Sequence, residues 1–228
     1  MANDIDTSIH TSDFAHKRLK KRYGKERRFR MWGVLAVSFA IFSLGWLLLS
    51  LASTGLTAFQ QNFMTLDVKL EQSAIAPEGT TDAQLLRSGN YRKIMQDTMY
   101  AQFPEVTDRK AKQQVFALVS ASGATNQLRQ MVVENPALVG KTVTVTVPTS
   151  DQVDQLLKGY IDRDLPESRR KVSDAQIAWI DAMVERGVIK KKFNTILFTN
   201  PDSRDPELAG IASAVIGSVM IVLISFAL

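Results

Sequence analysis

Carboxylate pairs and runs of basic residues are the side chains of this sequence whose types and spacing suit chemistry. Two carboxylate pairs stand out, Asp151/Asp154 and Asp162/Asp164. Paired carboxylates serve as general acid and base or as ligands of hard cations. Both pairs, however, fall where a turn or the start of a helix is expected, and carboxylates there usually accept hydrogen bonds from backbone N–H groups. We therefore interpret both pairs as structural.

Two basic clusters, Arg169-Arg170-Lys171 and Lys190-Lys191-Lys192, have two interpretations. They either meet an anion or the acidic face of a partner, or they form a solvated surface. The solvated surface is the interpretation that we favour, because charge runs usually have that role. Trp179 stands among apolar neighbours, so we expect it in the core and not as a platform for a ligand.

Other catalytic sets are absent from the sequence. The chain has no cysteine, and its two histidines are His10 and His16, near the N-terminus. No phosphate-binding glycine loop, metal-ligand spacing or nucleophile–base set is present in the sequence. We therefore expect no catalytic, cofactor-binding or metal-binding residue, and a protein that is not an enzyme.

The net charge of +5 is concentrated in residues 1–30, which carry nine Lys/Arg and four Asp/Glu. The rest of the chain is neutral. A nucleic-acid surface normally spreads basic residues over a folded face with aromatic residues between them. We therefore predict no nucleic-acid partner, and we interpret residues 1–30 as a basic cytoplasmic tail.

The first apolar segment is Met31–Ala52, which contains 22 residues and no charge. As a helix it measures about 33 Å, enough for a hydrocarbon core of about 30 Å. Trp32 and Trp46 lie towards its ends, and indole rings favour the membrane interface. Ser50-Leu51-Ala52 also loosely fits a signal-peptide cleavage site, but the long apolar run and the acidic residues of the tail favour a span. We predict a transmembrane helix at residues 31–56.

The second apolar segment is Leu208–Leu228, again without a charge and about 31 Å long as a helix. It has no polar face, which a buried helix of that length in a soluble protein should have. We predict a second transmembrane helix at residues 207–228. Small residues recur in it at four-residue spacing, which suits close packing of helices in lipid but is also common in such helices. They are Gly210, Ala214 and Ser218, with Ser213 and Gly217 beside them.

The basic run Lys17–Arg30 sets the expected orientation. Lysine and arginine next to a span stay on the cytoplasmic side, so the N-terminus is predicted in the cytoplasm and residues 57–206 outside it. The alternative role of the run is binding of lipids or of a partner.

Residues 57–206 predict an α+β domain with about three strands and several helices. The strands are expected at Met64–Leu70, Thr142–Val147 and Phe193–Thr199. The first helix is expected at Tyr91–Phe103. A second helix should begin after an N-cap at Asp108 and be interrupted at Ser122-Gly123, and a third should cover Leu128–Val132. The last two are expected at Asp151–Lys158 and after a capping box formed by Ser173 and Gln176. The last helix should turn Ile177, Ile180, Met183, Val184 and Val188 inward.

Several stretches taken together resemble a known family. They are YGKERRFRMWG, NFMTLDVKL, NYRKIMQDTMYAQFPEVTDR, LVGKTVTVTVPTSDQVDQLLKG and SDAQIAWIDAMVERGVIKKKFNTILFTNPDSRDPELAGIASAVIGS. The chain from about Lys17 onward resembles the N-terminal region of the PstA-type permease subunit of bacterial phosphate ABC transporters, in the variant with a large extracytoplasmic insertion. The most distinctive part is SRDPELAGI, which runs straight into the second apolar segment.

The resemblance implies partners and a place in the cell. A PstA-type permease lies in the bacterial inner membrane and works with a second permease subunit, an ATPase subunit and a phosphate-binding protein. Leu208 onward would be the first helix of the transporter core. The sequence stops at Leu228, before the further core helices and the loop that engages the ATPase, so we expect an N-terminal piece of a permease and carry over no functional residue.

The function predicted from these observations is a membrane subunit of an ATP-driven phosphate importer, in contact with membrane lipids. Its extracytoplasmic domain would dock or stabilise the permease assembly. The alternative is a two-span bacterial sensor or receptor with an extracytoplasmic sensing domain, and a third hypothesis is a self-contained two-span scaffold. Further apolar spans after residue 228 would favour the permease, whereas a cytoplasmic signalling domain would favour the sensor.

Overall fold

The computed structural model describes residues 13–76, 79 and 82–227, and the chain divides between Gly55 and Leu56 into two compact units. Each unit is described by itself. The predicted residues that lie outside the described part are the first twelve of the basic tail, including His10, and Leu228 at the end of the second apolar segment.

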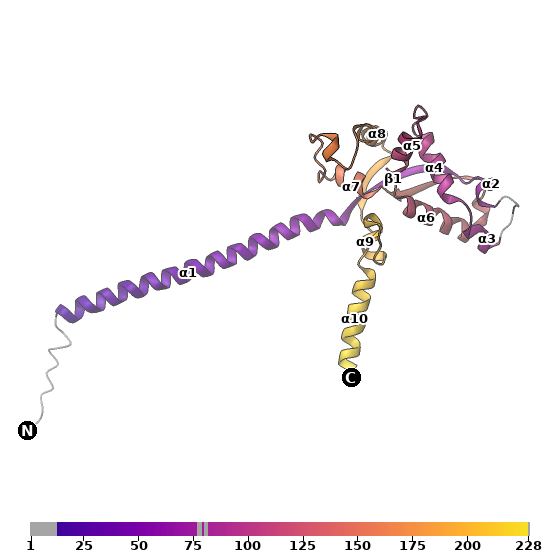
Figure 1. Cartoon of the computed structure of the whole chain (residues 1–228). Coiled ribbons are helices and arrows are strands. Elements are labelled where there is room, and N and C mark those ends of the chain that lie inside the picture. Colours follow the sequence, from indigo (N-terminus) through magenta and orange to yellow (C-terminus); the bar gives the residue numbers. More distant parts are fainter. Residues whose placement is uncertain (1–12, 77–78, 80–81, 228) are drawn as a thin grey trace, which may run out of the picture. The chain divides into compact units, whose positions relative to one another are not determined.

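The first unit contains one long helix, α1 (Asp13–Leu56, 44 residues) (Figure 1). Its uncharged part begins at Met31, and large apolar side chains there are exposed on every side of the helix; Leu44, for example, is 56% exposed and Leu49 is 70% exposed. Phe42 and Trp46, one turn apart, stack with their ring centroids 6.4 Å apart. By length and composition, one helix of the described residues is long and apolar enough to cross a membrane, and it covers Lys25–Phe59.

The second unit is an α+β fold built on a three-stranded antiparallel sheet with the order β2-β1-β3. The strands are β1 (Gln60–Lys69), β2 (Thr142–Pro148) and β3 (Ile189–Phe193). The register pairs Leu66 with Val145 on one side of β1, and Met64 with Ile189 on the other. The predicted α+β class and the strands at residues 64–70 and 142–147 are therefore confirmed.

Most helices of this unit are short, and side chains cap several of them. They are α2 (Gln72–Ile75), α3 (Ala83–Arg87), α4 (Tyr91–Ala101), α5 (Arg109–Phe116), α6 (Ala121–Glu134), α7 (Asp151–Leu157), α8 (Asp174–Glu185), α9 (Ile196–Thr199) and α10 (Ala212–Ala227). The carboxylate of Asp108 accepts hydrogen bonds from two backbone N–H groups at the start of α5. Ser173 and Gln176 form the predicted capping box of α8.

The core lies on one face of the sheet, because apolar residues of β1 alternate with polar ones. Met64, Leu66, Val68 and Leu70 are at most 2% exposed. Helices α4 and α6 pack against this sheet (Figure 1), and α5 and α8 pack against each other. The alternation predicted from the sequence therefore places the buried face of β1 correctly.

Three predictions within the domain are wrong in detail. The third strand is Ile189–Phe193, and the residues predicted for it form the end of β3, a turn and α9. Ser122-Gly123 do not interrupt a helix: they lie in the first turn of α6, for which the Ser120 hydroxyl accepts a hydrogen bond from the Gly123 N–H group. Val184 of α8 is 40% exposed, although Ile180 and Met183 are buried as expected.

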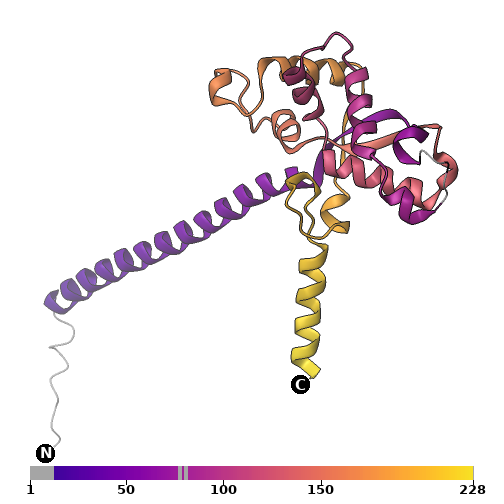
Figure 2. The ribbon, with the colours of Figure 1, turned by 45° about the vertical axis from the view of Figure 1, so that its right-hand side comes forward.

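The second apolar segment is also shorter as a helix than the uncharged run suggests. Leu208 ends a 3₁₀-helical turn (Pro206–Leu208), and α10 begins only at Ala212 and continues from there to Ala227 (Figure 2). Gly210 explains the difference, since a Cβ atom there would lie 2.2 Å from the Asn200 carbonyl oxygen and 2.6 Å from that of Ile196. Gly210 is therefore required for a close backbone approach to α9 and is not part of a small-residue face on the helix.

Candidate functional site

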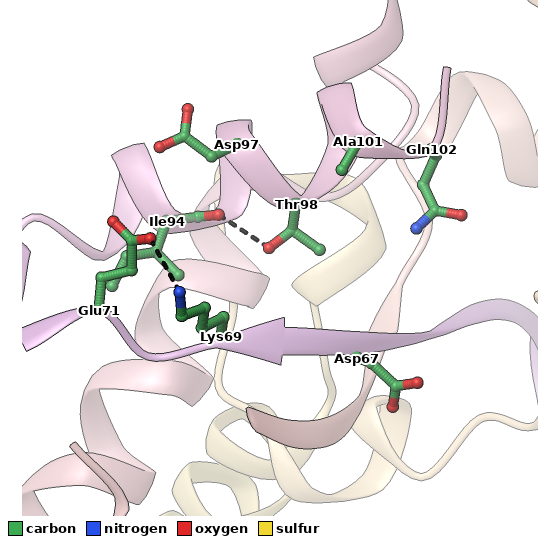
Figure 3. A pocket seen from close by; sticks show the side chains of 8 residues that line it. All are labelled: Asp67, Lys69, Glu71, Ile94, Asp97, Thr98, Ala101 and Gln102. Carbon is green, nitrogen blue, oxygen red and sulfur yellow. Dashed lines mark hydrogen bonds and ion pairs between the residues drawn. The ribbon is translucent and has the colours of Figure 1, made fainter. Parts of the chain in front are cut away.

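A groove between β1 and α4 is the candidate binding site of the domain (Figure 3). Its volume is about 280 Å³. Residues of β1 and of the segment after it form one wall, and residues of α4 form the other. The lining residues are Asp67, Lys69, Glu71, Ile94, Asp97, Thr98, Ala101 and Gln102.

The groove exists because β3 is shorter than β1. Strand β3 pairs with β1 only from Gln60 to Met64, and the Thr65 N–H group then donates a hydrogen bond to the Val188 carbonyl oxygen at 2.9 Å. The backbone N–H and C=O groups of Leu70 form hydrogen bonds with the segment that leads into β2. Because backbone groups alternate between the two edges of a strand, those of Asp67 and Lys69 face the opposite edge of β1, on the β3 side. No strand among the described residues pairs with this edge, which leaves it open beside α4.

Charged side chains lie along both walls of the groove. The Lys69 ammonium lies 3.7 Å from the Glu71 carboxylate, and in Figure 3 the Asp67 side chain points away from α4. The Thr144 hydroxyl donates a hydrogen bond of 2.6 Å to Asp67. Asp97 on α4 points away from β1 in Figure 3, so the charges that face each other at the groove are those of Lys69 and Glu71.

A hydroxyl group lines the groove on the α4 side. This hydroxyl, Thr98 Oγ1, donates a hydrogen bond to the Ile94 carbonyl oxygen of its own helix at 2.9 Å. Within the described ranges, no three His, Cys, Asp or Glu side chains are grouped so that they could hold a metal ion.

The pair Asp151/Asp154 lies at the start of α7, as predicted, but Asp154 does more than stabilise the helix start. One of its carboxylate oxygens accepts hydrogen bonds from the backbone N–H and the side-chain amide of Asn62, both at 2.8 Å. The other carboxylate oxygen lies 2.6 Å from the Lys158 ammonium. Asn62 is 3% exposed, so this network ties α7 to the beginning of β1 in the interior. The Asp162 carboxylate accepts from the Asp164 N–H group at 2.9 Å, as expected of a turn.

The two basic clusters differ in the structure. In the first, Arg170 is only 4% exposed at its side chain and forms an ion pair with Asp174, so Arg169–Lys171 is not one continuous surface. In the second, all three lysines of β3 are exposed. Trp179 is half-buried and its ring centroid lies 5.8 Å from that of Phe103, which agrees with a packing role.

Sequence reasoning missed two features of this domain. The groove depends on α4 crossing an open strand edge, and only Asp67, Lys69 and Glu71 at alternate positions give any local sign of it. The ion pair between Arg163 and Asp181 is bidentate, with distances of 2.9 and 3.0 Å, and joins a loop to α8. Both features bring together residues that are distant in the sequence.

One protein family matches the chain. Its description is "Domain of unknown function (DUF3333)", and the match covers residues 16–167. The matched stretch contains the uncharged part of α1 and the first two strands, and it ends before α8, β3 and α10. No curated protein and no solved structure matches the chain.

Proposed function

We propose that this chain, which belongs to the DUF3333 family, is a membrane subunit of an ATP-driven phosphate importer. In this proposal the α+β domain lies outside the bacterial inner membrane and docks or stabilises the permease assembly. A separate subunit hydrolyses ATP, and this chain is not an enzyme.

The observation that carries the membrane part of the proposal is the exposure of α1. From Met31 to Leu56 the helix has no charge, and its large apolar side chains face outward on all sides. Leaving apolar surface in water costs about 25 cal/mol per Å². A lipid environment removes that cost along the whole helix, and the helix is long enough to cross a hydrocarbon core of about 30 Å.

Charge supports the proposed orientation. Nine lysines and arginines precede Met31, and nothing comparable follows Leu56 at once. Because basic residues next to a span are retained in the cytoplasm, the N-terminus is proposed to lie there and the α+β domain to lie on the periplasmic side.

Helix α10 is proposed as the second span. Its 16 residues measure about 24 Å, less than an average hydrocarbon core. Short spans are accommodated by local thinning of the bilayer or by association with other helices. Ala214, Gly217 and Ser218 are small enough for such association, which agrees with a helix that packs against other core helices of a permease.

The phosphate importer itself is supported by the resemblance to PstA-type permeases, which is most specific where SRDPELAGI leads into α10. The partners proposed on this basis are a second permease subunit, an ATPase subunit and a phosphate-binding protein. The groove between β1 and α4 favours a second candidate, a two-span sensor, because an open groove in an outer domain suits a ligand.

Uptake of radioactive phosphate at limiting phosphate tests the transport proposal. We expect a strain that lacks the gene to lose uptake and a plasmid copy of the gene to restore it. Unchanged uptake in the deletion strain, with every other phosphate importer also deleted, would exclude transport. Normal uptake with an altered transcriptional response to an external signal would favour the sensor.

Cysteine labelling tests the topology, because the natural sequence has no cysteine to interfere. Gln130→Cys lies on the exposed side of α6, and Glu26→Cys lies on α1 before the uncharged run. We expect a membrane-impermeant maleimide to label position 130 in intact spheroplasts and position 26 only after lysis. The reverse pattern would overturn the orientation, and recovery of the chain in the soluble fraction after carbonate washing would overturn the membrane anchor.

A further inference from the structure

Three phenylalanines from separate segments form an exposed row at one corner of the α+β domain. Phe59 ends the 3₁₀-helical turn before β1, Phe193 ends β3, and Phe198 belongs to α9. The Phe198 ring stacks on both others, with centroid distances of 5.9 Å to Phe59 and 5.8 Å to Phe193. The three side chains are 39%, 60% and 45% exposed in chain order, and we call them the aromatic row.

Hydrogen bonds of Asn194 hold the aromatic row in place. The Asn194 N–H group donates to the Phe59 carbonyl oxygen at 2.8 Å, and its side-chain amide donates to the Ala58 carbonyl oxygen at 3.1 Å. Its side-chain oxygen accepts from the Leu197 N–H group at 3.2 Å. One residue therefore joins all three segments, so the exposed rings belong to an ordered surface of the fold.

A contiguous group of exposed aromatic rings normally marks a surface that something covers. Exposure of these apolar rings to water is unfavourable, yet the Asn194 hydrogen bonds hold the segments that carry them in place. A partner that covers these rings must present an apolar surface to them and must be able to accommodate the positive charge of the nearby lysines.

Chain continuity indicates what lies beside the aromatic row. Phe59 follows Leu56, the last residue of α1, by three positions. On the other side, the Ile211 N–H group donates to the Leu197 carbonyl oxygen at 2.8 Å, which fixes the start of α10 to α9. Phe59 is thus next in the chain to α1, and the α9 segment that carries Phe198 is bonded to the residue that precedes α10.

Charge points to the same partner. Lys190, Lys191 and Lys192 directly precede Phe193, all are exposed, and none forms an ion pair with any described residue. Aromatic residues together with lysines are typical of surfaces that rest at the boundary between lipid headgroups and acyl chains, where lysine meets anionic headgroups.

We propose that the aromatic row is a lipid-contact surface that seats the α+β domain on a bilayer containing anionic phospholipid, with Lys191, which shares a face of β3 with Phe193, at the headgroups. The inference rests on the proposed membrane anchoring of α1. It adds that the domain itself rests on the bilayer surface and is not held away from it on a flexible tether.

Fluorescence quenching in vesicles tests this inference on the full chain. Single cysteines at Phe198, Leu44 and Gln130 are labelled with an environment-sensitive fluorophore, and the chains are reconstituted in vesicles of phosphatidylethanolamine and phosphatidylglycerol. The vesicles carry lipids with a nitroxide close to the headgroup or deep in the acyl chains. We expect several-fold stronger quenching at 198 by the headgroup-level nitroxide than at 130, and quenching of 44 by the deep nitroxide.

The three positions separate the possible failures. Quenching at 44 with none at 198 would overturn the lipid-contact surface and leave the membrane anchor intact. Absence of quenching at 44 would overturn the anchor itself. A protected fluorophore at 198 that is not quenched by lipid, and whose signal depends on protein density in the vesicle, would show that a second copy covers the row and would also overturn the inference.

A matched pair of substitutions checks that the rings cause the contact. Phe193→Ser should reduce the quenching at 198 several-fold, whereas Val184→Ser, at another exposed apolar residue of the domain, should leave it unchanged. Vesicles of phosphatidylcholine alone should weaken the quenching at 198 if the lysines contribute. Equal quenching for both serine variants would overturn the role of the row.

Discussion

Helices α1 and α10 are both uncharged over their apolar parts, and their side chains are exposed on all sides. They differ in length and in whether they belong to the same compact unit as the α+β domain. Helix α1 has 44 residues and forms its own compact unit. Helix α10 has 16 residues and belongs to the same unit as the α+β domain. The Ile211 and Ala212 N–H groups at its start donate hydrogen bonds to carbonyl oxygens in and next to α9. The apolar runs look alike in the sequence, but only one of them is helical throughout.

This difference shows what an apolar run does and does not determine. Hydropathy predicts which residues avoid water, whereas tertiary contacts decide how many of them become helix. In the second run, the first residues turn against α9 because Gly210 allows a close approach. We expect α1 to have apolar length to spare in a bilayer, and α10 to have none.

A charge placed at the centre of each helix should separate them most clearly. Arginine at the centre of a span costs about 3 kcal/mol on insertion scales. We expect Met220→Arg to prevent insertion of α10 and to move a C-terminal reporter to the other side of the membrane. Leu44→Arg should leave α1 inserted, because the longer apolar run compensates for the charge. Equal loss of insertion in both variants would contradict the comparison.

Removal of the Asp154 carboxylate should be the next largest effect, now on the folding of the domain. Asp154→Ala leaves the Asn62 amide and the Lys158 ammonium without their partner in a nearly buried place. We expect the free energy of unfolding to fall by about 2–4 kcal/mol in denaturant titrations in detergent.

Asp151→Ala is the matched control for that variant, since Asp151 accepts one hydrogen bond, from Gln155. It should change the free energy of unfolding by less than about 1 kcal/mol. Neither variant should alter the carbonate-resistant fraction, because neither touches α1. Similar losses of stability in the two variants would show that Asp154 has no special role.

Gly210→Ala should disturb the junction between α9 and α10. The added methyl group would lie 2.2 Å from the Asn200 carbonyl oxygen, so the backbone has to shift, at a cost of about 1–3 kcal/mol. Hydrogen exchange of the Ile211 and Ala212 amides should accelerate. Gly217→Ala, which meets no atom within 4 Å, should slow exchange in α10 or leave it unchanged. No change for Gly210→Ala would mean that the junction does not limit the length of α10.

The smallest effect is expected at Tyr91, which is buried far from either apolar helix in the sequence. Burial raises the pKa of the Tyr91 phenol above its ordinary value of 10.0, and the nearby Arg129 opposes this. Because the folded-state pKa is raised, the stability that the protonated phenol contributes is complete below pH 10 and is lost as the pH rises through the folded-state value.

Tyr91→Phe should therefore flatten the alkaline decline of the unfolding free energy. It should also lower that free energy by about 1 kcal/mol at neutral pH, since the phenol donates a hydrogen bond of 2.7 Å to the Leu86 carbonyl oxygen. Insertion of both helices should be unaffected. An unchanged alkaline slope would assign the decline to other groups.

The parts of the fold that the sequence predicted correctly are those that depend on local periodicity. Strict alternation marked Thr142–Val147, and alternate burial marked the residues of β1. The third strand was misplaced because three of its five residues are lysines, which hide the apolar pattern. Lysines of this kind are common on edge strands, and β3 lies at an edge of the sheet.

The candidate site was less predictable, because it is a product of tertiary structure. The groove requires β3 to stop at Met64 of β1 and α4 to lie beside the open edge. One partner of Asp154, Asn62, is distant in the sequence. The spacing of Asp154 from Asp151 therefore indicated only a helix start. Local patterns cannot report such pairs without information on contacts.

The strand order β2-β1-β3 has a consequence for how the domain folds during synthesis. The central strand, β1, leaves the ribosome directly after α1, but both of its neighbours are made later, and β3 comes close to the end of the domain. Pairings between distant segments form slowly. If the domain crosses the membrane during synthesis, β1 emerges outside the cytoplasm with both edges unpaired and stays so until β2 and β3 follow. We expect β1 to be the segment that a chaperone in that compartment binds first.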